Sequence, residues 1–577
     1  MTIARASLRA FARPWLATPL LSLLILTTPA TLPAHAATIT IVNVDGAGEG
    51  FNDPNPRSPI GGNTGTTLGD QRLFVFNHAA SIWGALLPSN VTIQVRAQFN
   101  SQTCSATSGV LGSAGARSVH ADFPGAEIAN MWYSQALANK LSGTDQDALL
   151  EDINATFNSD VDNSVCLGDV NWYYGIDGDE GTDIELLPVV LHEIAHGLGF
   201  QTFANTSTGA FLSDTPDIFA HFLLNKSTGL HWDEMGNNNA RKNSATNTGN
   251  LVWDGFAVNF RAPHFLLHDP ELRVNSPGGI AGSYVAADAE FGLPLDLTGV
   301  TGNVVLVNDG ISPTSDACEP IINGASVSGN IALLDRGVCN FTVKVAAAQA
   351  VGATAVIVVN NVTGAPVPMG GVDPSITIPS LMISLADGNT IKNALLSGPV
   401  NATVRRHPTL LAGAHPDGEV RMYAPNPLES GSSVSHFDVT GTPNLLMEPG
   451  INDDLHTDVD LTRELFEDIG WLPRLTAVTP GAPAAPAFRV RSAPNPFSPA
   501  TVITLQLPRA GRTKVTIVDI QGRLVKRLMD GWMPAGPHGI SWDGTDDRGA
   551  KVGAGVYFSR VESNGHQAGQ KLVKLER

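Results

Sequence analysis

Residues 192–196 read His-Glu-Ile-Ala-His, and this segment constrains the fold of the chain more than any other. Two histidines four residues apart lie on the same face of a helix, about one turn apart, so both imidazoles can point at one atom. The preceding residues, from Ile184 to Val190, are mostly apolar, which predicts that the helix lies in a hydrophobic core. Buried imidazoles need polar partners. Those partners are either a shared metal ion or, as the plainer alternative, hydrogen bonds within the core.

The helix is expected to run from Ile184 to Gly197. Thr182 and Asp183 are candidate N-cap residues, and Gly197 or Gly199 can end the helix. Zn²⁺ binds imidazole nitrogen at about 2.0–2.1 Å, and two histidines at this helical spacing can share one ion. The segment therefore predicts a zinc site on a buried helix.

Glu193 adds a chemical function to the histidine pair. Glu193 lies one position further along the helix than His192, so its carboxylate does not point at the metal together with the two imidazoles. It can instead reach a water bound to the metal, where a general base is needed. A catalytic zinc ion takes three protein ligands and keeps one position for water, so this site needs a third ligand. The candidates elsewhere in the sequence are Glu185, Asp214, Asp217, His221, His231, His264, His268 and His436.

The longer run from His192 to Phe200 resembles the zinc-binding helix of the metzincin peptidases. In that family a glycine at the position of Gly199 lets the chain turn sharply below the metal. Most metzincins place the third histidine three residues after this glycine, where this chain has Thr202. Threonine is a poor zinc ligand, so the third ligand must come from another part of the chain.

Leishmanolysin and its relatives are the metzincins in which a long insertion separates the third histidine from the first two. Residues 435–438, Ser-His-Phe-Asp, and residues 444–449, Asn-Leu-Leu-Met-Glu-Pro, resemble the third-ligand segment and the methionine turn of that group. The resemblance implies that His436 is the third ligand and that Met447 lies below the metal as apolar support. It also implies an α+β metzincin-like catalytic domain that hydrolyses peptide bonds.

The N-terminal 36 residues have the pattern of a signal peptide. Three arginines precede an apolar stretch at 20–26, and Ala34-His35-Ala36 forms a small-residue cleavage site before Ala37. A signal anchor is the alternative, but the apolar stretch is too short to span a bilayer comfortably. We expect cleavage near Ala36, no stable membrane insertion afterwards, and a secreted, extracellular protein.

The length of the chain indicates how many domains to expect, and its net charge indicates which partners are excluded. A chain of 577 residues is too long for one ordinary core, so several domains are expected. The formal net charge of −19 repels phosphate backbones, which argues against nucleic acid as a partner. Acidic loops at 177–183 and 453–460 are compatible with Ca²⁺, but neither has the spacing of an EF-hand loop, and surface turns explain both.

The four cysteines are Cys104, Cys166, Cys318 and Cys339. An oxidising compartment favours disulfides. Pairing of nearest neighbours, Cys104 with Cys166 and Cys318 with Cys339, is the simplest arrangement, although the sequence alone permits three connectivities.

Between residues 270 and 406, apolar strands alternate with helical patterns, which is typical of an α/β domain. The segments 329–337, Gly-Asn-Ile-Ala-Leu-Leu-Asp-Arg-Gly, and 339–341, Cys-Asn-Phe, resemble the protease-associated (PA) domain. The resemblance implies that a PA domain is inserted between His196 and His436. An inserted domain with adjacent termini can leave the geometry of its host intact.

Residues 476–488 form a Pro- and Ala-rich linker, and the chain beyond it alternates apolar and polar side chains as β-strands do. This tail resembles the immunoglobulin-like domain of flagellar hook-capping proteins at residues 494–497, 519–523, 542–544 and 555–558. The resemblance implies an all-β sandwich that engages export or surface-attachment machinery. An inert stability module is the alternative.

The predicted organisation is a signal peptide (1–36), a catalytic domain in two parts (37–269 and 407–475), an inserted PA domain (270–406), a linker (476–488) and an immunoglobulin-like domain (489–577). The expected function is that of a secreted zinc endopeptidase acting on proteins or peptides, with Glu193 as general base. Two alternatives stay open. One is a non-catalytic binding or adhesion protein with a structural metal site, and the other is a zinc hydrolase of a non-peptide amide or ester.

Overall fold

The computed structural model describes residues 36–450, 459–472, 489–507, 511–521, 523–533, 536–563 and 566–575. The expected signal peptide, apart from Ala36, and the expected linker at 476–488 lie outside the described residues, as does most of the acidic loop at 453–460. Within the described ranges, no helix has both the length and the apolar character needed to cross a membrane.

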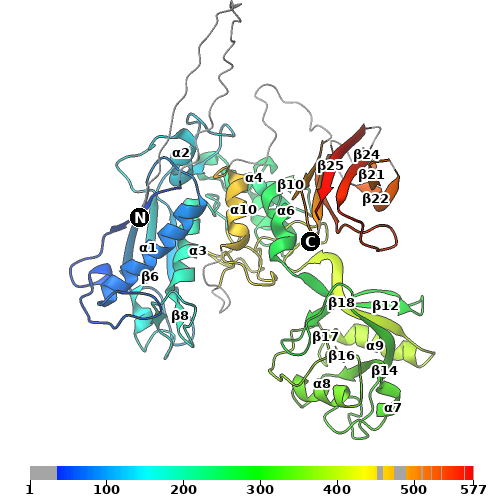
Figure 1. Cartoon of the computed structure of the whole chain (residues 1–577). Coiled ribbons are helices and arrows are strands. Elements are labelled where there is room, and N and C mark those ends of the chain that lie inside the picture. Colours follow the sequence, from blue (N-terminus) through cyan, green and yellow to red (C-terminus); the bar gives the residue numbers. More distant parts are fainter. Residues whose placement is uncertain are drawn as a thin grey trace, which may run out of the picture. The chain divides into compact units, whose positions relative to one another are not determined.

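The N-terminal region is built on a four-stranded sheet with the order β1-β2-β6-β3. β1 (Ile39–Asn43), β2 (Ile93–Asn100) and β6 (Ile153–Asn158) are parallel, and β3 (Gly112–Ala116) pairs antiparallel with β6 at the edge. In β2 the apolar residues are buried and the polar residues between them are half-buried, as expected for a strand with one face in the core. α1 (Leu68–Leu86) and α3 (Leu186–Leu198) pack against each other and against this sheet (Figure 1).

α3 is the predicted helix, but its start differs from the expected one. The helix begins at Leu186 because the two residues before it form the short strand β8 (Ile184–Glu185), which pairs with β7 (Trp172–Tyr173). Glu185 is therefore the N-cap residue, and Thr182 and Asp183 are not, contrary to the prediction. The helix ends at Leu198, and Gly199 follows with a φ of 128°, a backbone conformation that favours glycine.

Shorter elements complete this region. Its remaining helices are η1 (Gly50–Asn52), α2 (Gln135–Ser142), η2 (Ser159–Asp162), η3 (Leu212–Asp214), α4 (Ile218–Phe222), η4 (Trp232–Glu234), α5 (Asn238–Ser244), α6 (Phe256–Phe265) and α10 (Asp460–Ile469). Its remaining strands are β4 (Val119–His120), β5 (Tyr133–Ser134), β9 (Leu223–Asn225), β10 (Leu230–His231) and β11 (Leu251–Trp253).

One hydrophobic core joins residues from both sides of the predicted insertion. It contains side chains from Ala37 to Leu266 and again from Leu411 to Trp471. The rings of Trp83 and Phe466 lie 5.2 Å apart, and the Trp471 indole N–H donates to the Leu198 carbonyl at 2.9 Å. Segments on the two sides of the insertion therefore fold as one domain.

The segment between these two parts forms a closed barrel with the strand order β12-β13-β17-β16-β15-β14-β18. Its strands are β12 (His268–Ser276), β13 (Gly282–Asp288), β14 (Val300–Leu306), β15 (Ile331–Asp335), β16 (Ala355–Val359), β17 (Ser380–Ile383) and β18 (Asn401–Leu411). Its helices are α7 (Gly324–Val327), α8 (Phe341–Ala350) and α9 (Leu385–Leu395). β12 pairs antiparallel with β18, so the chain enters and leaves the barrel at neighbouring residues, His268 and Leu411.

The described residues of the C-terminal region, from Arg489 onwards, form β-strands and no helix, as predicted. One sheet has the order β19-β20-β23, with β19 (Arg489–Ala493), β20 (Thr501–Leu507) and β23 (Gly536–Trp542). The other has the order β22-β21-β24-β25, with β21 (Gly511–Asp519), β22 (Leu524–Met533), β24 (Gly555–Ser563) and β25 (His566–Lys574). A separate core, which includes Phe497 and Trp542, belongs to this region alone.

Candidate metal centre

The structure brings His192, His196 and His436 together, with one ring nitrogen of each within 4.8 Å of the others. α3 carries the first two, and His436 lies in the segment that returns to the core after the barrel. The Nε2 atom of His192 lies 3.1 Å from Nε2 of His196 and 3.2 Å from Nε2 of His436. A tetrahedral ion with bonds of about 2.0–2.1 Å separates its ligand atoms by roughly 3.3 Å, so the spacing fits zinc.

Backbone carbonyls hold the other nitrogen of each ring. Nδ1 of His192 lies 2.7 Å from the Leu446 carbonyl oxygen, and Nδ1 of His196 lies 2.8 Å from that of Phe200. Nδ1 of His436 lies 2.7 Å from the carbonyl oxygen of Ser432. Because a carbonyl oxygen only accepts hydrogen bonds, each Nδ1 must carry the proton. A neutral ring then has an unprotonated Nε2, so three lone pairs converge on one point, as metal ligation requires.

Burial keeps these rings neutral. It lowers the pKa of His192 to about 4, and burial together with the neighbouring His192 lowers the pKa of His196 to about 3. Burial and the two other histidines lower the pKa of His436 well below its usual value. Neutral imidazole is the form that binds metal. Hydrogen bonds among core histidines are a poor alternative here, since no Nε2 has a proton to donate.

Glu193 is 7% exposed and lies beside the edge strand β3. Burial raises the pKa of its carboxyl to about 8, and a hydrogen bond from the Ala114 backbone N–H works in the opposite direction. A Cβ atom at Gly112 would lie 3.2 Å from Cγ of Glu193, so the strand passes close to this side chain. A nearby cation would favour the ionised carboxylate, which is the form that can accept a proton.

Met447 lies in the loop that also supplies the carbonyl of Leu446. Its side chain is fully buried in the shared core, and its carbonyl accepts a hydrogen bond from the Phe437 backbone N–H at 2.8 Å. The Asp460 carboxylate, at the start of α10, accepts the backbone N–H of Leu446. The loop after His436 is therefore fastened both to the segment that carries this histidine and to α10.

The other candidate ligands have different surroundings. Asp217 caps α4 and accepts a hydrogen bond from the Thr202 hydroxyl at 2.8 Å, which accounts for both residues. His221 lies 2.7 Å from Asp233. His231 lies 2.9 Å from Asp254. The remaining candidates are placed at the start of α3 (Glu185), in η3 (Asp214), in α6 (His264) and at the start of β12 (His268). Among the described residues, the only group of three possible ligands that contains more than one histidine is the one with His436.

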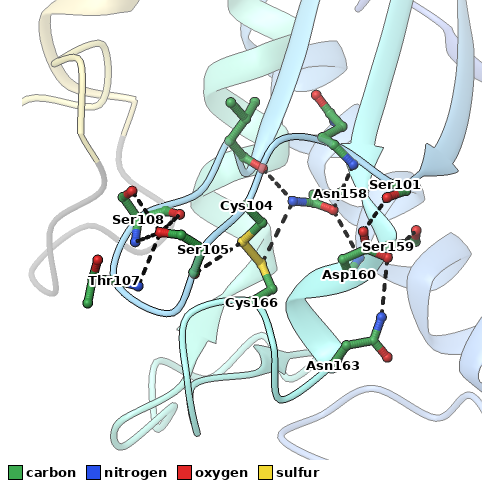
Figure 2. Close-up of a disulfide and its surroundings, with 12 residues drawn as sticks. Ser101, Cys104, Ser105, Thr107, Ser108, Asn158, Ser159, Asp160, Asn163 and Cys166 are labelled. Carbon is green, nitrogen blue, oxygen red and sulfur yellow. Dashed lines mark hydrogen bonds between the residues drawn. A yellow bond between two sulfur atoms is a disulfide. The ribbon is translucent and has the colours of Figure 1, made fainter.

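The Cys104–Cys166 disulfide, one of the two predicted pairs, fastens the loop that leads into β3 (Figure 2). Asn158 links the residues before β3 to the start of η2. Its amide group donates to the Val110 carbonyl at 2.8 Å, and its amide oxygen accepts the backbone N–H of Asp160 at 2.9 Å. The disulfide therefore stabilises the approach to the strand that contacts Glu193.

Two parts of the chain match known domain families. Residues 300–391 match the PA domain, and residues 497–567 match the FlgD Ig-like domain. The chain is thus a multidomain protein that contains a PA domain and a C-terminal immunoglobulin-like domain. Neither match includes the three histidines.

Curated relatives share only a part of the chain. Vacuolar-sorting receptor 1 of Pisum sativum is 32% identical over 183 residues, which is 30% of this chain and 29% of the receptor. Vacuolar-sorting receptor 4 of Arabidopsis thaliana is 30% identical over 151 residues, which is 24% of each protein. The chain thus spans less than a third of the length of these relatives.

Solved structures also match only in part. An aminopeptidase from Aneurinibacillus sp. strain AM-1 is 25% identical over 24% of this chain and 31% of that chain, with a TM-score of 0.20. FlgD from P. aeruginosa is 26% identical over 13% of this chain and 60% of that chain, with a TM-score of 0.12. Both similarities cover less than a quarter of this chain.

Proposed function

We propose that this protein is a secreted zinc-dependent endopeptidase of the metzincin type, with His192, His196 and His436 as the metal ligands. The observation that carries the proposal is the convergence of three Nε2 atoms, each in a ring whose opposite nitrogen lies within hydrogen-bond distance of a backbone carbonyl. Such an arrangement would supply three neutral ligands, and the described residues add no fourth His, Cys, Asp or Glu to this group. A set of three protein ligands is the one that catalytic zinc takes.

Glu193 is the proposed general base. A bound zinc ion would lower the pKa of water and polarise the carbonyl group of the peptide. The Glu193 carboxylate accepts the proton of the attacking water and then delivers it to the leaving amine nitrogen. The Ala114 N–H orients this carboxylate from β3. A purely structural zinc site has no use for such a base and usually has four protein ligands, which favours hydrolysis over a binding or adhesion role.

Three variants test the ligand set and the base separately. Purified protein should contain about one zinc per chain by elemental analysis, on the expectation of a single three-ligand site. His436→Ala should lose most of this zinc, whereas the control His221→Ala should retain it, because His221 pairs with Asp233 instead. Glu193→Gln should keep the zinc but cleave unfolded protein at least about 10²-fold more slowly.

Two outcomes would contradict the proposal. One is zinc that remains in folded His436→Ala protein, and the other is undiminished cleavage by Glu193→Gln. A substrate panel of peptides, esters and non-peptide amides decides the substrate class, since the same zinc chemistry acts on all three.

We propose that one accessory domain selects substrates and that the other determines where the protein is located. The PA domain is inserted between the second and third proposed ligands, and we propose that it selects protein substrates. For the FlgD-like domain, we propose a role in export or surface attachment after cleavage of the signal peptide near Ala36.

A further inference from the structure

A second group of candidate ligands lies in the barrel, in the segment between β14 and β15. Asp309, Asp316 and Glu319 each offer one carboxylate oxygen, and these oxygens lie within 4.8 Å of one another. Oxygens on opposite sides of a Ca²⁺ ion with bonds of 2.3–2.6 Å are separated by about 4.6–5.2 Å, and adjacent oxygens lie closer. One calcium ion can therefore contact all three carboxylates.

Asp309 shows that this group is more than a cluster of surface acids. The residue is only 4% exposed. Its Oδ1 accepts the backbone N–H of Ile311 at 3.2 Å, and its own N–H donates to the Thr314 carbonyl at 2.9 Å. Its Oδ2 is buried and has no hydrogen-bond partner among the described residues. A buried carboxylate oxygen without a partner is costly, and a cation beside it would remove this cost.

The charge of the cluster is only partly neutralised by the protein. Lys344 is fully buried, and its Nζ lies 3.7 Å from Oδ2 of Asp316 and 2.6 Å from the Asp316 carbonyl oxygen. Among the ion pairs of the described residues, this is the one that reaches the three carboxylates. Three carboxylates and one ammonium leave a formal charge of −2, which a divalent cation balances.

Neighbouring groups hold Asp316 in place without an ion. Its Oδ1 accepts the backbone N–H of Cys318 at 3.2 Å, and Cys318 forms the second predicted disulfide with Cys339. A Cβ atom at Gly337 would lie 2.2 Å from Oδ2 of Asp316, so the chain approaches this carboxylate closely from the other side. A preformed arrangement of this kind lowers the entropic cost of binding.

We propose that Asp309, Asp316 and Glu319 form a divalent-cation site in the PA domain, and that its ion is Ca²⁺. All three ligands are hard oxygen donors on one irregular segment, which suits the flexible geometry of Ca²⁺ better than the nitrogen and sulfur ligands that zinc prefers. The site is independent of the three histidines and of the proposed peptidase activity.

Calorimetric titration of CaCl₂ into the zinc-loaded full chain tests this site. The parent protein should bind Ca²⁺, and Asp309→Asn and Glu319→Gln should each lower the stoichiometry by one or weaken binding at least about tenfold, as loss of a charged ligand does. Asp309 is buried, so Asp309→Asn can disturb the fold. Glu319 is only half-buried, and Glu319→Gln is therefore the second variant, which is expected to fold even if Asp309→Asn does not. The matched control is Glu290→Gln, at an exposed carboxylate of the same barrel region, and it should bind as the parent does.

Zinc content should remain unchanged in all three variants. The proposal would be overturned if the parent bound no Ca²⁺, if Asp309→Asn and Glu319→Gln bound Ca²⁺ like the parent, or if Glu290→Gln weakened binding equally. Because zinc content and peptide cleavage are measured on the same samples, a failure here is distinguishable from a failure of the proposed function.

Discussion

His436 illustrates what decides a site at the scale of single residues. It lies 244 residues from His192 along the chain, yet their Nε2 atoms are 3.2 Å apart. The groups that orient all three rings are the carbonyls of Leu446, Phe200 and Ser432. Every residue has a carbonyl, so no pattern in the sequence could identify these three.

Met447 permits a prediction at this scale. Its side chain is fully buried in the shared core, so Met447→Ala should leave a cavity and lower the free energy of unfolding by about 2–5 kcal/mol. Thermal unfolding measures the loss. Zinc content should persist at temperatures where the variant is folded, because the proposed role is support and not ligation. Loss of zinc from folded Met447→Ala protein would contradict that role.

At the scale of elements, the end of α3 determines how His196 is presented. Gly199 has a φ of 128°, and a Cβ there would lie 3.1 Å from the Ile469 side chain and 3.2 Å from the Ser134 hydroxyl. Gly199→Ala should therefore destabilise the protein by about 1 kcal/mol or more. Denaturant unfolding checks this value, with Gly278→Ala as a control because a Cβ at Gly278 meets open space. An unchanged midpoint for Gly199→Ala would show that the turn tolerates a side chain.

The disulfide beside β3 gives a second prediction for an element. It closes a loop of 62 residues, for which the chain-entropy model gives a stabilisation of about 4 kcal/mol. The double variant Cys104→Ser, Cys166→Ser should unfold at a lower temperature. It should also cleave substrate more slowly, because the loop leads into the strand that contacts Glu193. Full activity at temperatures where the variant is folded would contradict the predicted effect of the disulfide on catalysis.

The short helix η4 permits a prediction about pH. Its N-cap, His231, has a raised pKa, chiefly because of the hydrogen bond with Asp254. The folded state therefore holds a proton on His231 more tightly than the unfolded chain does. This contribution to stability is complete below about pH 6.5, the usual pKa of histidine, and is lost as pH rises through the folded-state pKa. His231→Gln should thus lower the melting temperature more at pH 6 than at pH 8.5. An equal loss at both pH values would contradict the assignment.

At the scale of the whole molecule, the barrel and the C-terminal region have hydrophobic cores of their own, apart from the core that holds the histidines. His268 and Leu411 pair at the base of the barrel, and paired residues of antiparallel strands lie about 4.5–5.5 Å apart. Replacing residues 270–409 by a short Gly-Ser loop should therefore preserve zinc binding and the cleavage of small peptides while changing preference among protein substrates. A folded deletion variant without zinc would show that the barrel supports the site.

The C-terminal region has its own core, whereas the core around the histidines ends at Trp471. Truncation after Leu472 should leave peptide cleavage within about twofold of the full chain, since a domain with its own core can be removed without opening the core of its neighbour. Export or retention at the cell surface should change instead. An inactive, folded truncation would count against a separable C-terminal region.

Most of what could be predicted from the sequence is local. The helical spacing of His192 and His196, with Glu193 between them, needs only helix geometry. The strand and helix patterns of the PA region likewise follow from short apolar runs. The prediction failed where a distant segment intervened: the N-cap of α3 moved to Glu185 because Trp172–Tyr173 pairs with the two residues before the helix.

The sequence by itself determined a buried helix with two histidines and an acid, because helix geometry depends only on near neighbours in the chain. It indicated the inserted domain and the all-β tail through short segments that resemble known domain families. Only the tertiary structure decided which of the candidate ligands approaches the helix, how the cysteines pair, that the inserted sheet closes into a barrel, and that Asp309, Asp316 and Glu319 meet. These depend on the packing of segments that are far apart in the sequence. The energy of such contacts is shared among many side chains, so no single pattern of residues encodes it.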